Sequence, residues 1–336
     1  MPDEVRWRDA DRGRSVLMRP GLVGELPTAL EQEGWARFEL LSTERALRDA
    51  PGLADAARAT HIVPLGQIPE TSAAVMEAVG SDSLVAFGGG RVIDTAKAVA
   101  AVRGGRVAAA PTTLSGAEMT AIHRLPAGYE DITGIRPELI LADPGAMTSA
   151  PEDQLRATAM NALAHGADSL YTPLADGLSR RSALKGAGLI ATSLDAGPGG
   201  RSARDLALGA LLAADAIDRA GLALHHVLSQ TSVRVFETPH AETNAALLPI
   251  VMEEMSGRAP EQIGALAEAL RTDSGGIRER IEELAGGRRG LGNLGADRGR
   301  IGQAIEVAMA RGELSGMTPG EPIQAADLER LIEAAW

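Results

Sequence analysis

The first half of the chain alternates short apolar runs with stretches of helical periodicity. The apolar runs are predicted to be strands, at residues 15–18, 38–41, 61–64, 84–87, 106–110 and 138–142. Strands that alternate with helices pair in parallel and form an α/β sheet with helices on both faces. In such sheets ligands collect beyond the carboxyl ends of the strands.

The pattern changes near residue 149 and is helical almost to the end. A long helix is predicted from residue 151 through residue 165. Further helices follow, with breaks expected at residues 197–200, 239, 257, 275–276 and 286–287. We therefore predict two domains, an α/β domain over 1–148 and an all-α domain over 149–336.

Composition narrows the class of protein. A chain of 336 residues that is 45% hydrophobic can bury a large core. Its formal net charge of −12 argues against a nucleic-acid partner, because neutralising phosphates requires clustered Lys and Arg. The absence of cysteine fits a reducing compartment, and no apolar run approaches the length of a membrane span. We expect a cytoplasmic protein with no membrane partner.

A run of three glycines follows the fourth predicted strand. Gly88, Gly89 and Gly90 lead directly into an Ala-rich helical pattern. A strand that turns through glycines into a helix presents free backbone N–H groups and the positive end of the helix dipole. Glycine also lets a phosphate approach the backbone, so the turn suits the diphosphate of a dinucleotide. The alternative is a tight turn that binds no ligand.

Hydroxyl side chains follow two other predicted strands. Thr112, Thr113 and Ser115 lie after the fifth strand, and Ser42 and Thr43 end the second. Such hydroxyls can bond phosphate or ribose oxygens, but they are also ordinary helix caps and turn residues. No carboxylate stands at residues 42–43 to reject a ribose phosphate, so we expect NADH with tolerance of NADPH.

The histidines form the second chemical signal. Asn161 and His165 are four residues apart and share one helix face. His225 and His226 lie on a later helical pattern, and His240 begins another after Pro239. Histidines from three helices suit a divalent metal with an open position for substrate. The alternative for each is a histidine with an ordinary hydrogen bond, as for the remaining two, His61 and His123.

These motifs together resemble one known family. G-G-G-R-V-I-D-T-A-K, which starts at Gly88 and contains Asp94, is similar to G-G-G-S-x-x-D-x-A-K of the iron-containing (group III) alcohol dehydrogenases. P-T-T-L-S-G-A-E-M-T, at residues 111–120, is similar to that family's P-T-T-x-x-G-S-E-x-T. The segments at 161–165 and 239–249 fall in the right order. One branch of the family, the maleylacetate reductases, has similar features: the paired His225 and His226, the sequence P-H-A-E-T at 239–243, and Asn161.

The resemblance implies a dehydroquinate synthase-like architecture, with a Rossmann-like N-terminal domain that binds NAD(P) and a helical C-terminal domain. It implies cofactor contacts from the glycine turn, Asp94 and the hydroxyls named above. Most members hold Fe²⁺ or Zn²⁺ with one Asp and three His, which carry over to Asn161, His165, His226 and His240. Such folds commonly form homodimers.

Four positions depart from the family pattern. Asn161 replaces the metal-binding Asp, so a divalent ion should bind much less tightly. Maleylacetate reductases share this Asn and are regarded as working without metal. Gln230 stands where a His is usual, Arg91 replaces the motif's Ser, and the usual Lys is missing from the segment 123–137.

The expected activity is NAD(P)H-dependent reduction of a small carbonyl or enone acid. Without metal, His226 and His165 are the candidates to hold and protonate the substrate oxygen, with His225 and His240 beside them. A dicarboxylate also needs cationic partners, for which Arg124, Arg136 and Arg234 are candidates. The alternatives are a metal-dependent alcohol dehydrogenase, a sugar-phosphate cyclase, and an NAD-binding homologue that has lost catalysis.

Overall fold

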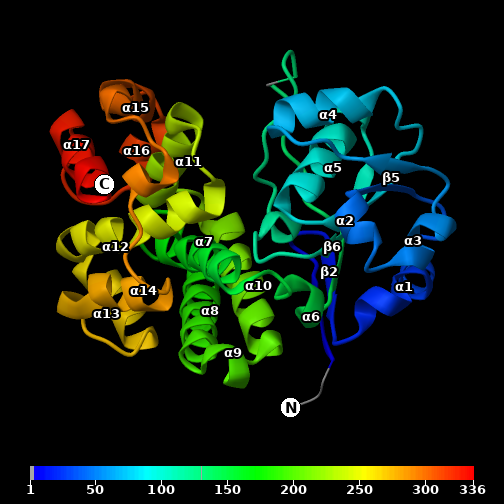
Figure 1. Ribbon diagram of the computed structural model, residues 1–336, viewed down its shortest axis with the longest axis horizontal. Coiled ribbons are helices and arrows are strands. Elements are labelled where there is room, and N and C mark those ends of the chain that lie inside the picture. The colour runs from blue at the N-terminus through cyan, green and yellow to red at the C-terminus, as the bar shows by residue number, and fades with distance from the viewer. Residues whose placement is uncertain (1–3, 130) are drawn as a thin grey trace. The chain divides into compact units, whose positions relative to one another are not determined.

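The computed structural model describes residues 4–129 and 131–336; residues 1–3, within the expected first domain, lie outside the described part. The chain forms two compact units, Met1–Ala150 and Pro151–Trp336 (Figure 1). The boundary lies beside the division expected near residue 148.

The first unit contains a seven-stranded sheet in the order β1-β2-β7-β6-β5-β3-β4. Its strands are β1 (Val5–Asp9), β2 (Arg14–Met18), β3 (Glu39–Ser42), β4 (Thr60–Ile62), β5 (Ser83–Gly88), β6 (Arg106–Pro111) and β7 (Leu139–Ala142). From β2 to β4 all neighbours pair in parallel.

The expectation of an entirely parallel sheet is wrong at one edge, because β1 pairs antiparallel with β2. No strand was predicted over Val5–Asp9. In the structure its side chains alternate between half-buried and exposed, and none is fully buried. A continuous apolar run marks a strand covered on both faces, and this edge strand is not one.

Helices cover both faces of the sheet. They are α1 (Leu26–Gln32), α2 (Glu44–Leu47), α3 (Pro51–Ala56), α4 (Ile68–Met76), α5 (Gly90–Arg103) and α6 (Pro144–Met147), with 3-10 turns η1 (Leu22–Glu25) and η2 (Ala117–Met119). Val85 and Phe87 of β5 pack in one core cluster, and Leu84 and Ala86 pack in the other. Both faces of β5 are therefore buried, and its carboxyl end delivers the glycine turn.

The second unit, all of which is described, contains helices and no strand, as predicted. The longer helices are α7 (Glu152–Tyr171), α8 (Gly177–Asp195), α10 (Ala203–Ala220), α11 (Leu224–Phe236), α12 (His240–Arg258), α13 (Pro260–Ala269), α14 (Ile277–Leu284), α15 (Ile301–Met309) and α17 (Ala325–Ala334). Shorter elements are α9 (Gly197–Gly200), α16 (Gly312–Met317), η3 (Ser274–Gly276), η4 (Leu291–Leu294) and η5 (Arg298–Arg300).

The buried helix α7 places polar groups inside this unit. From Ala159 to Tyr171 every side chain of α7 is buried, so Asn161, His165 and Asp168 all lie in the interior. Close approach of the neighbouring helices α8 and α10 needs glycine, since a Cβ on Gly186 would lie 2.7 Å from the carbonyl oxygen of Gly209. Among the described residues, no helix combines the length and apolar character needed to cross a bilayer.

Candidate functional site

The glycine turn and the hydroxyl loop lie side by side in the first unit. The backbone N–H of Thr112 donates to the carbonyl oxygen of Gly88 across 3.0 Å. A Cβ on Gly89 would lie 3.2 Å from Cγ2 of Thr113, and one on Gly90 would lie 3.0 Å from Oγ of Ser115. The structure thus brings the two sequence motifs together, and a larger residue at Gly89 or Gly90 would crowd the hydroxyl loop.

The hydroxyls near the strand ends differ in their partners. Thr113 Oγ1 is buried and has no hydrogen-bond partner in the described part of the chain. Ser42 Oγ instead donates to the carbonyl oxygen of Phe87 across 2.7 Å. Thr43 Oγ1 caps α2 by accepting from the N–H of Ala46 at 3.2 Å. Thr113 thus has a buried hydroxyl without a partner in the described part of the chain, whereas Ser42 and Thr43 have structural partners.

Asp94 and Lys97 connect helix α5 to the loop that follows β6. Lys97 Nζ lies 2.7 Å from Asp94 Oδ1 and donates to the carbonyl oxygens of Ala117 and Ile122. The neighbouring Glu118 is fully buried, and burial raises its pKa to about 7. Asp94 thus positions a buried lysine, whereas its predicted contact with a cofactor stays a prediction.

Three histidines gather in the second unit. The rings of His165 on α7 and His226 on α11 stack with centroids 5.0 Å apart and planes 10° apart. The ring of His225 meets that of His226 edge-on at 5.1 Å. His240, the first residue of α12, is exposed, and its charge helps to lower the pKa of His165. Helices α7 and α11 therefore bring His165, His225 and His226 into ring contact, whereas His240 lies at the exposed start of α12.

Asp168 organises this histidine cluster. Its Oδ2 accepts from His226 Nδ1 at 2.7 Å and from the backbone N–H of His226 at 3.1 Å, and Tyr171 donates its hydroxyl to Oδ1. Burial raises the pKa of Asp168, but the hydrogen bond and charge of His226 outweigh it and bring the pKa to about 2. The carboxylate is ionised and can only accept, so it holds the proton of His226 on Nδ1.

The remaining ring nitrogens are open for chemistry. His226 Nε2 and His165 Nδ1 are buried, and neither has a hydrogen-bond partner among the described residues. Burial, followed by the charges of His226, His240 and His225, holds the pKa of His165 well below its usual range. His165 is therefore neutral near pH 7.

His225 has a different role from its neighbour. Its Nε2 donates to the side-chain oxygen of Asn244 across 2.9 Å, and the amide of Asn244 donates to the carbonyl oxygen of His240 at 2.7 Å. Burial, assisted by the charge of His226, lowers the pKa of His225 to about 4. His225 thus links α11 to the start of α12.

The family's metal-ligand set is only partly present. Among the described residues, no three His, Cys, Asp or Glu side chains form a group arranged to hold a metal ion. The carried-over set comprises Asn161, His165, His226 and His240, which offers imidazoles and an amide but no carboxylate. Because the only nearby carboxylate described, Asp168, bonds Nδ1 of His226, the donor set fits a divalent ion incompletely.

Four other residues named in the sequence analysis lie elsewhere. His61 pairs with Glu39 at 2.7 Å, and Ile135 donates its backbone N–H to His123 at 3.1 Å. Arg124 donates to Gln67 at 2.5 Å, and Arg234 lies on the exposed face of α11. None of the four lies in the histidine cluster.

Sequence reasoning missed several residues of the cluster. Asp168 follows His165 by three positions on α7, so its spacing alone placed it on the same helix face. Asn244 lies four residues after His240 on α12 in the same manner. For Gln230, which the sequence analysis named, the missed feature is its partner: it accepts a hydrogen bond from Arg311 Nη1 at 2.8 Å, a contact between distant segments.

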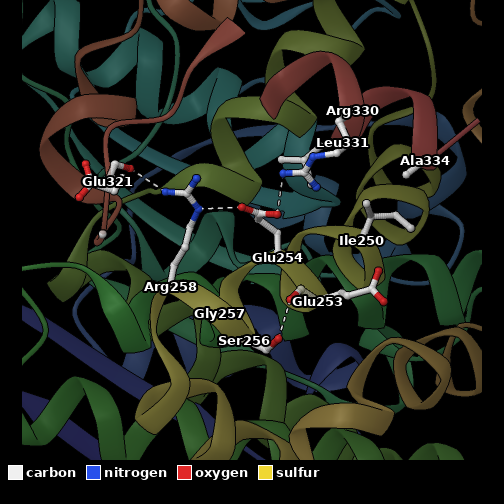
Figure 2. Close-up of a pocket in the computed structure, with 11 residues that line it drawn as sticks. Ile250, Glu253, Glu254, Ser256, Gly257, Arg258, Glu321, Arg330, Leu331 and Ala334 are labelled. Carbon is white, nitrogen blue, oxygen red and sulfur yellow. Dashed lines mark hydrogen bonds and ion pairs between the residues drawn. The ribbon is translucent and has the colours of Figure 1, made fainter. Parts of the chain in front are cut away.

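A groove of about 770 Å³ lies between α12 and α17, away from the histidines. Figure 2 shows the side chains of Arg258 and Arg330 turned toward that of Glu254. Glu254 pairs with Arg258 and with Arg330, each at 2.8 Å, and Arg258 also donates to the carbonyl oxygen of Glu321. These three charges therefore pair with one another within the groove.

Two family models match the chain. The model described as "Fe-containing alcohol dehydrogenase family, C-terminal" matches residues 156–336. The model described as "Iron-containing alcohol dehydrogenase" matches residues 18–125. Together they cover the glycine turn and the histidine cluster.

Individual relatives agree with these models. The chain is 32% identical over 271 residues to maleylacetate reductase 2 of Cupriavidus pinatubonensis, covering 76% of each chain. It is 29% identical over 340 residues to maleylacetate reductase of Burkholderia cepacia, covering 96% of this chain and 95% of the relative.

Solved structures share the fold. An iron-containing alcohol dehydrogenase of Corynebacterium glutamicum superposes with a TM-score of 0.84 at 29% identity, covering 95% of this chain and 94% of the other. The maleylacetate reductase of Agrobacterium tumefaciens superposes with a TM-score of 0.84 at 25% identity, covering 100% of this chain and 99% of the other. The chain belongs to the Fe-containing alcohol dehydrogenase family and is an NAD(P)-dependent oxidoreductase.

Proposed function

We propose that this protein uses NAD(P)H to reduce a small keto acid or enone acid similar to maleylacetate. The observation that carries the proposal is the pairing of His226 with Asp168, which leaves Nε2 of His226 buried and open beside the stacked ring of His165. Relatives named maleylacetate reductases, at 28–33% identity, support the substrate class.

The glycine turn supports a dinucleotide cofactor. Gly88, Gly89 and Gly90 leave the backbone accessible at the start of α5, and Thr113 offers an open hydroxyl next to them. We propose that the turn holds the diphosphate, with Thr112 and Ser115 beside it. When bound, the reduced cofactor supplies the hydride. With no carboxylate at the end of β3, we expect NADH with tolerance of NADPH.

The histidines are suited to hold the substrate oxygen and move a proton to it. Asp168 fixes the ring of His226 and its tautomer, as a carboxylate does for a catalytic imidazole. Stacking places His165 beside it with a second open nitrogen. As charge develops on the substrate oxygen, His226 carrying a second proton, taken from solvent, on Nε2 would donate that proton to the oxygen and return to the neutral ring. His165 would donate a hydrogen bond to the same oxygen, with His225 and His240 supporting them.

A metal-dependent alcohol dehydrogenase is the second candidate. One observation favours it: metal-bound histidines commonly donate their other ring nitrogen to a carboxylate, as His226 does to Asp168. The neutral His165 would be a suitable ligand. The missing carboxylate at Asn161 argues for the metal-independent enzyme.

Oxidation of NADH and NADPH with maleylacetate and a panel of keto acids and aldehydes tests these candidates. Enzyme dialysed against EDTA should keep its activity toward a keto acid, and His226→Asn should reduce that activity. His61→Asn, in the first unit, is the matched control and should leave turnover unchanged. Activity that vanishes with EDTA and returns with Fe²⁺ or Zn²⁺ would instead support the second candidate. Cofactor binding without turnover would indicate a homologue that has lost catalysis.

A further inference from the structure

Arg91 occupies an unusual position at the start of helix α5. It is the second residue of the helix, directly after the glycine turn, and stands where the family motif has Ser. The side chain is half-buried, and its Nε atom is buried without a hydrogen bond. In the described ranges 4–129 and 131–336, no carboxylate lies within ion-pair distance of its guanidinium.

The charge of Arg91 does not stabilise the helix that carries it. The first turn of a helix is the positive end of its dipole, so a cation there is unfavourable. The first turn of α5 contains no acidic residue, and the next carboxylate along the helix, Asp94, is engaged by Lys97 at 2.7 Å. The protein therefore keeps an uncompensated cation beside a backbone that already favours anions.

We propose that Arg91 binds a phosphate of the dinucleotide cofactor, an inference that rests on the proposed function. A guanidinium donates paired hydrogen bonds to phosphate oxygens, which satisfies the open Nε and supplies the missing counter-charge. The adjacent glycine backbone gives the same anion its N–H groups. The glycine turn favours the diphosphate of the cofactor as the group that Arg91 binds. The 2′-phosphate of NADPH is the other phosphate group that offers the same oxygens to a guanidinium.

Binding titrations of the intact chain test this assignment without relying on turnover. Dissociation constants for NADH, NADPH and ADP-ribose are measured by fluorescence or calorimetry at low and high salt. Arg91→Ser, which restores the family residue, should weaken binding by about 10- to 100-fold, as expected for a charged hydrogen bond. Arg91→Lys should keep part of the affinity. Arg103→Ser, at the exposed last turn of the same helix, is the matched control and should change nothing.

The ligands separate the two phosphate sources. Equal losses for NADH, NADPH and ADP-ribose assign Arg91 to the diphosphate, and a loss confined to NADPH assigns it to the 2′-phosphate. Unchanged constants in Arg91→Ser, with wild-type circular dichroism, would overturn this inference and leave the proposed function standing. A wild-type protein that binds neither cofactor would overturn the proposed function together with the inference.

Discussion

Asp168 holds His226 by side chain and backbone at once. Its Oδ2 lies 2.7 Å from Nδ1 of the His226 ring and 3.1 Å from the backbone N of the same residue. The carboxylate also accepts from the N–H of Ala223, so it satisfies the first turn of α11, whose own N-cap has no side-chain hydrogen bond. Asp168 therefore sets both the start of the helix and the orientation of the ring it presents.

Replacing Asp168 with Asn tests this double role. The amide keeps the size of the side chain, but its NH₂ group cannot accept from Nδ1 or from the backbone. We expect turnover to fall by about 10- to 100-fold, as for other residues that orient a functional histidine. Asp153→Asn, on the exposed first turn of α7, is the matched control. Wild-type kcat in Asp168→Asn would refute the orienting role.

Stability should fall in mild acid because His225 is buried as the neutral ring. Its pKa is about 4 in the folded protein, against an ordinary 6.5. Between these values the unfolded chain takes up a proton that the folded protein does not, so the free energy of unfolding falls as pH falls from about 6.5 to about 4. The slope for one histidine is at most about 1.4 kcal/mol per pH unit.

Urea denaturation at pH 7.5 and pH 5 measures this slope, with His225→Gln as the variant. We expect the variant to lose less stability than the wild type between the two pH values. An identical loss in both proteins would mean that His225 does not titrate as its burial implies.

Glu118 should act in the opposite sense. The unfolded chain loses this proton above about pH 4.5, whereas the folded protein keeps it until about pH 7. The free energy of unfolding therefore falls as pH rises across this window. Glu118→Gln removes the ionisable group and should stabilise the protein at pH 8 by on the order of 3 kcal/mol, with no gain at pH 4. Melting temperatures of Glu118→Gln and of Glu77→Gln, an exposed control in the same unit, measure this effect at the two pH values. An equal gain in both variants at pH 8 would mean that the effect does not come from burial of Glu118.

Gly89→Val should prevent cofactor binding. The first atom of the new side chain would lie 3.2 Å from Cγ2 of Thr113, and the rest would occupy the space over the backbone where a phosphate must approach. Titration with NADH measures the loss. Gly24→Val is the matched control, because a Cβ there meets nothing within 4 Å. Normal affinity in folded Gly89→Val would place the cofactor elsewhere.

Some of these relationships could be predicted from the sequence because they depend on local pattern. The buried strand β5 appeared as a continuous apolar run, and the separation of Asn161 and His165 placed them on one face of α7. Partners across long separations could not be predicted. Asp168 and His226 are 58 residues apart in the sequence, and only the packing of α7 and α11 shows that they meet.

The roles of the hydroxyl side chains could not be separated from the sequence alone. Thr43 and Thr113 both follow strands and looked equivalent in the sequence, where capping and ligand binding were both open. In the structure Thr43 caps α2, whereas Thr113 Oγ1 has no partner in the described part of the chain. Helix α2 begins directly after Thr43, so the Thr43 hydroxyl bonds the backbone at the start of that helix. The side chain of Thr113 instead lies beside the glycine turn.

Asn161→Asp should convert a weak metal site into a stronger one. Asn161 lies one turn before His165 on α7, and an aspartate there would restore the family's carboxylate beside neutral imidazoles. Even at an effective dielectric of about 20, attraction between unit charges at contact distance is about 4 kcal/mol, which corresponds to several hundred-fold or more in affinity. The wild type should therefore retain turnover after EDTA dialysis, and the variant should bind Fe²⁺ or Zn²⁺ more tightly.

Melting temperature gives a second readout of the same change. Without metal, the new carboxylate is buried without a counter-charge, so Asn161→Asp should melt below the wild type. Added Zn²⁺ should raise its melting temperature more than that of the wild type, since a ligand that binds only the folded state stabilises it. Asn293→Asp, the same substitution at an exposed position of η4, should show neither effect. Equal Zn²⁺ responses in Asn161→Asp and Asn293→Asp would mean that Asn161 does not share a ligand position with the histidines.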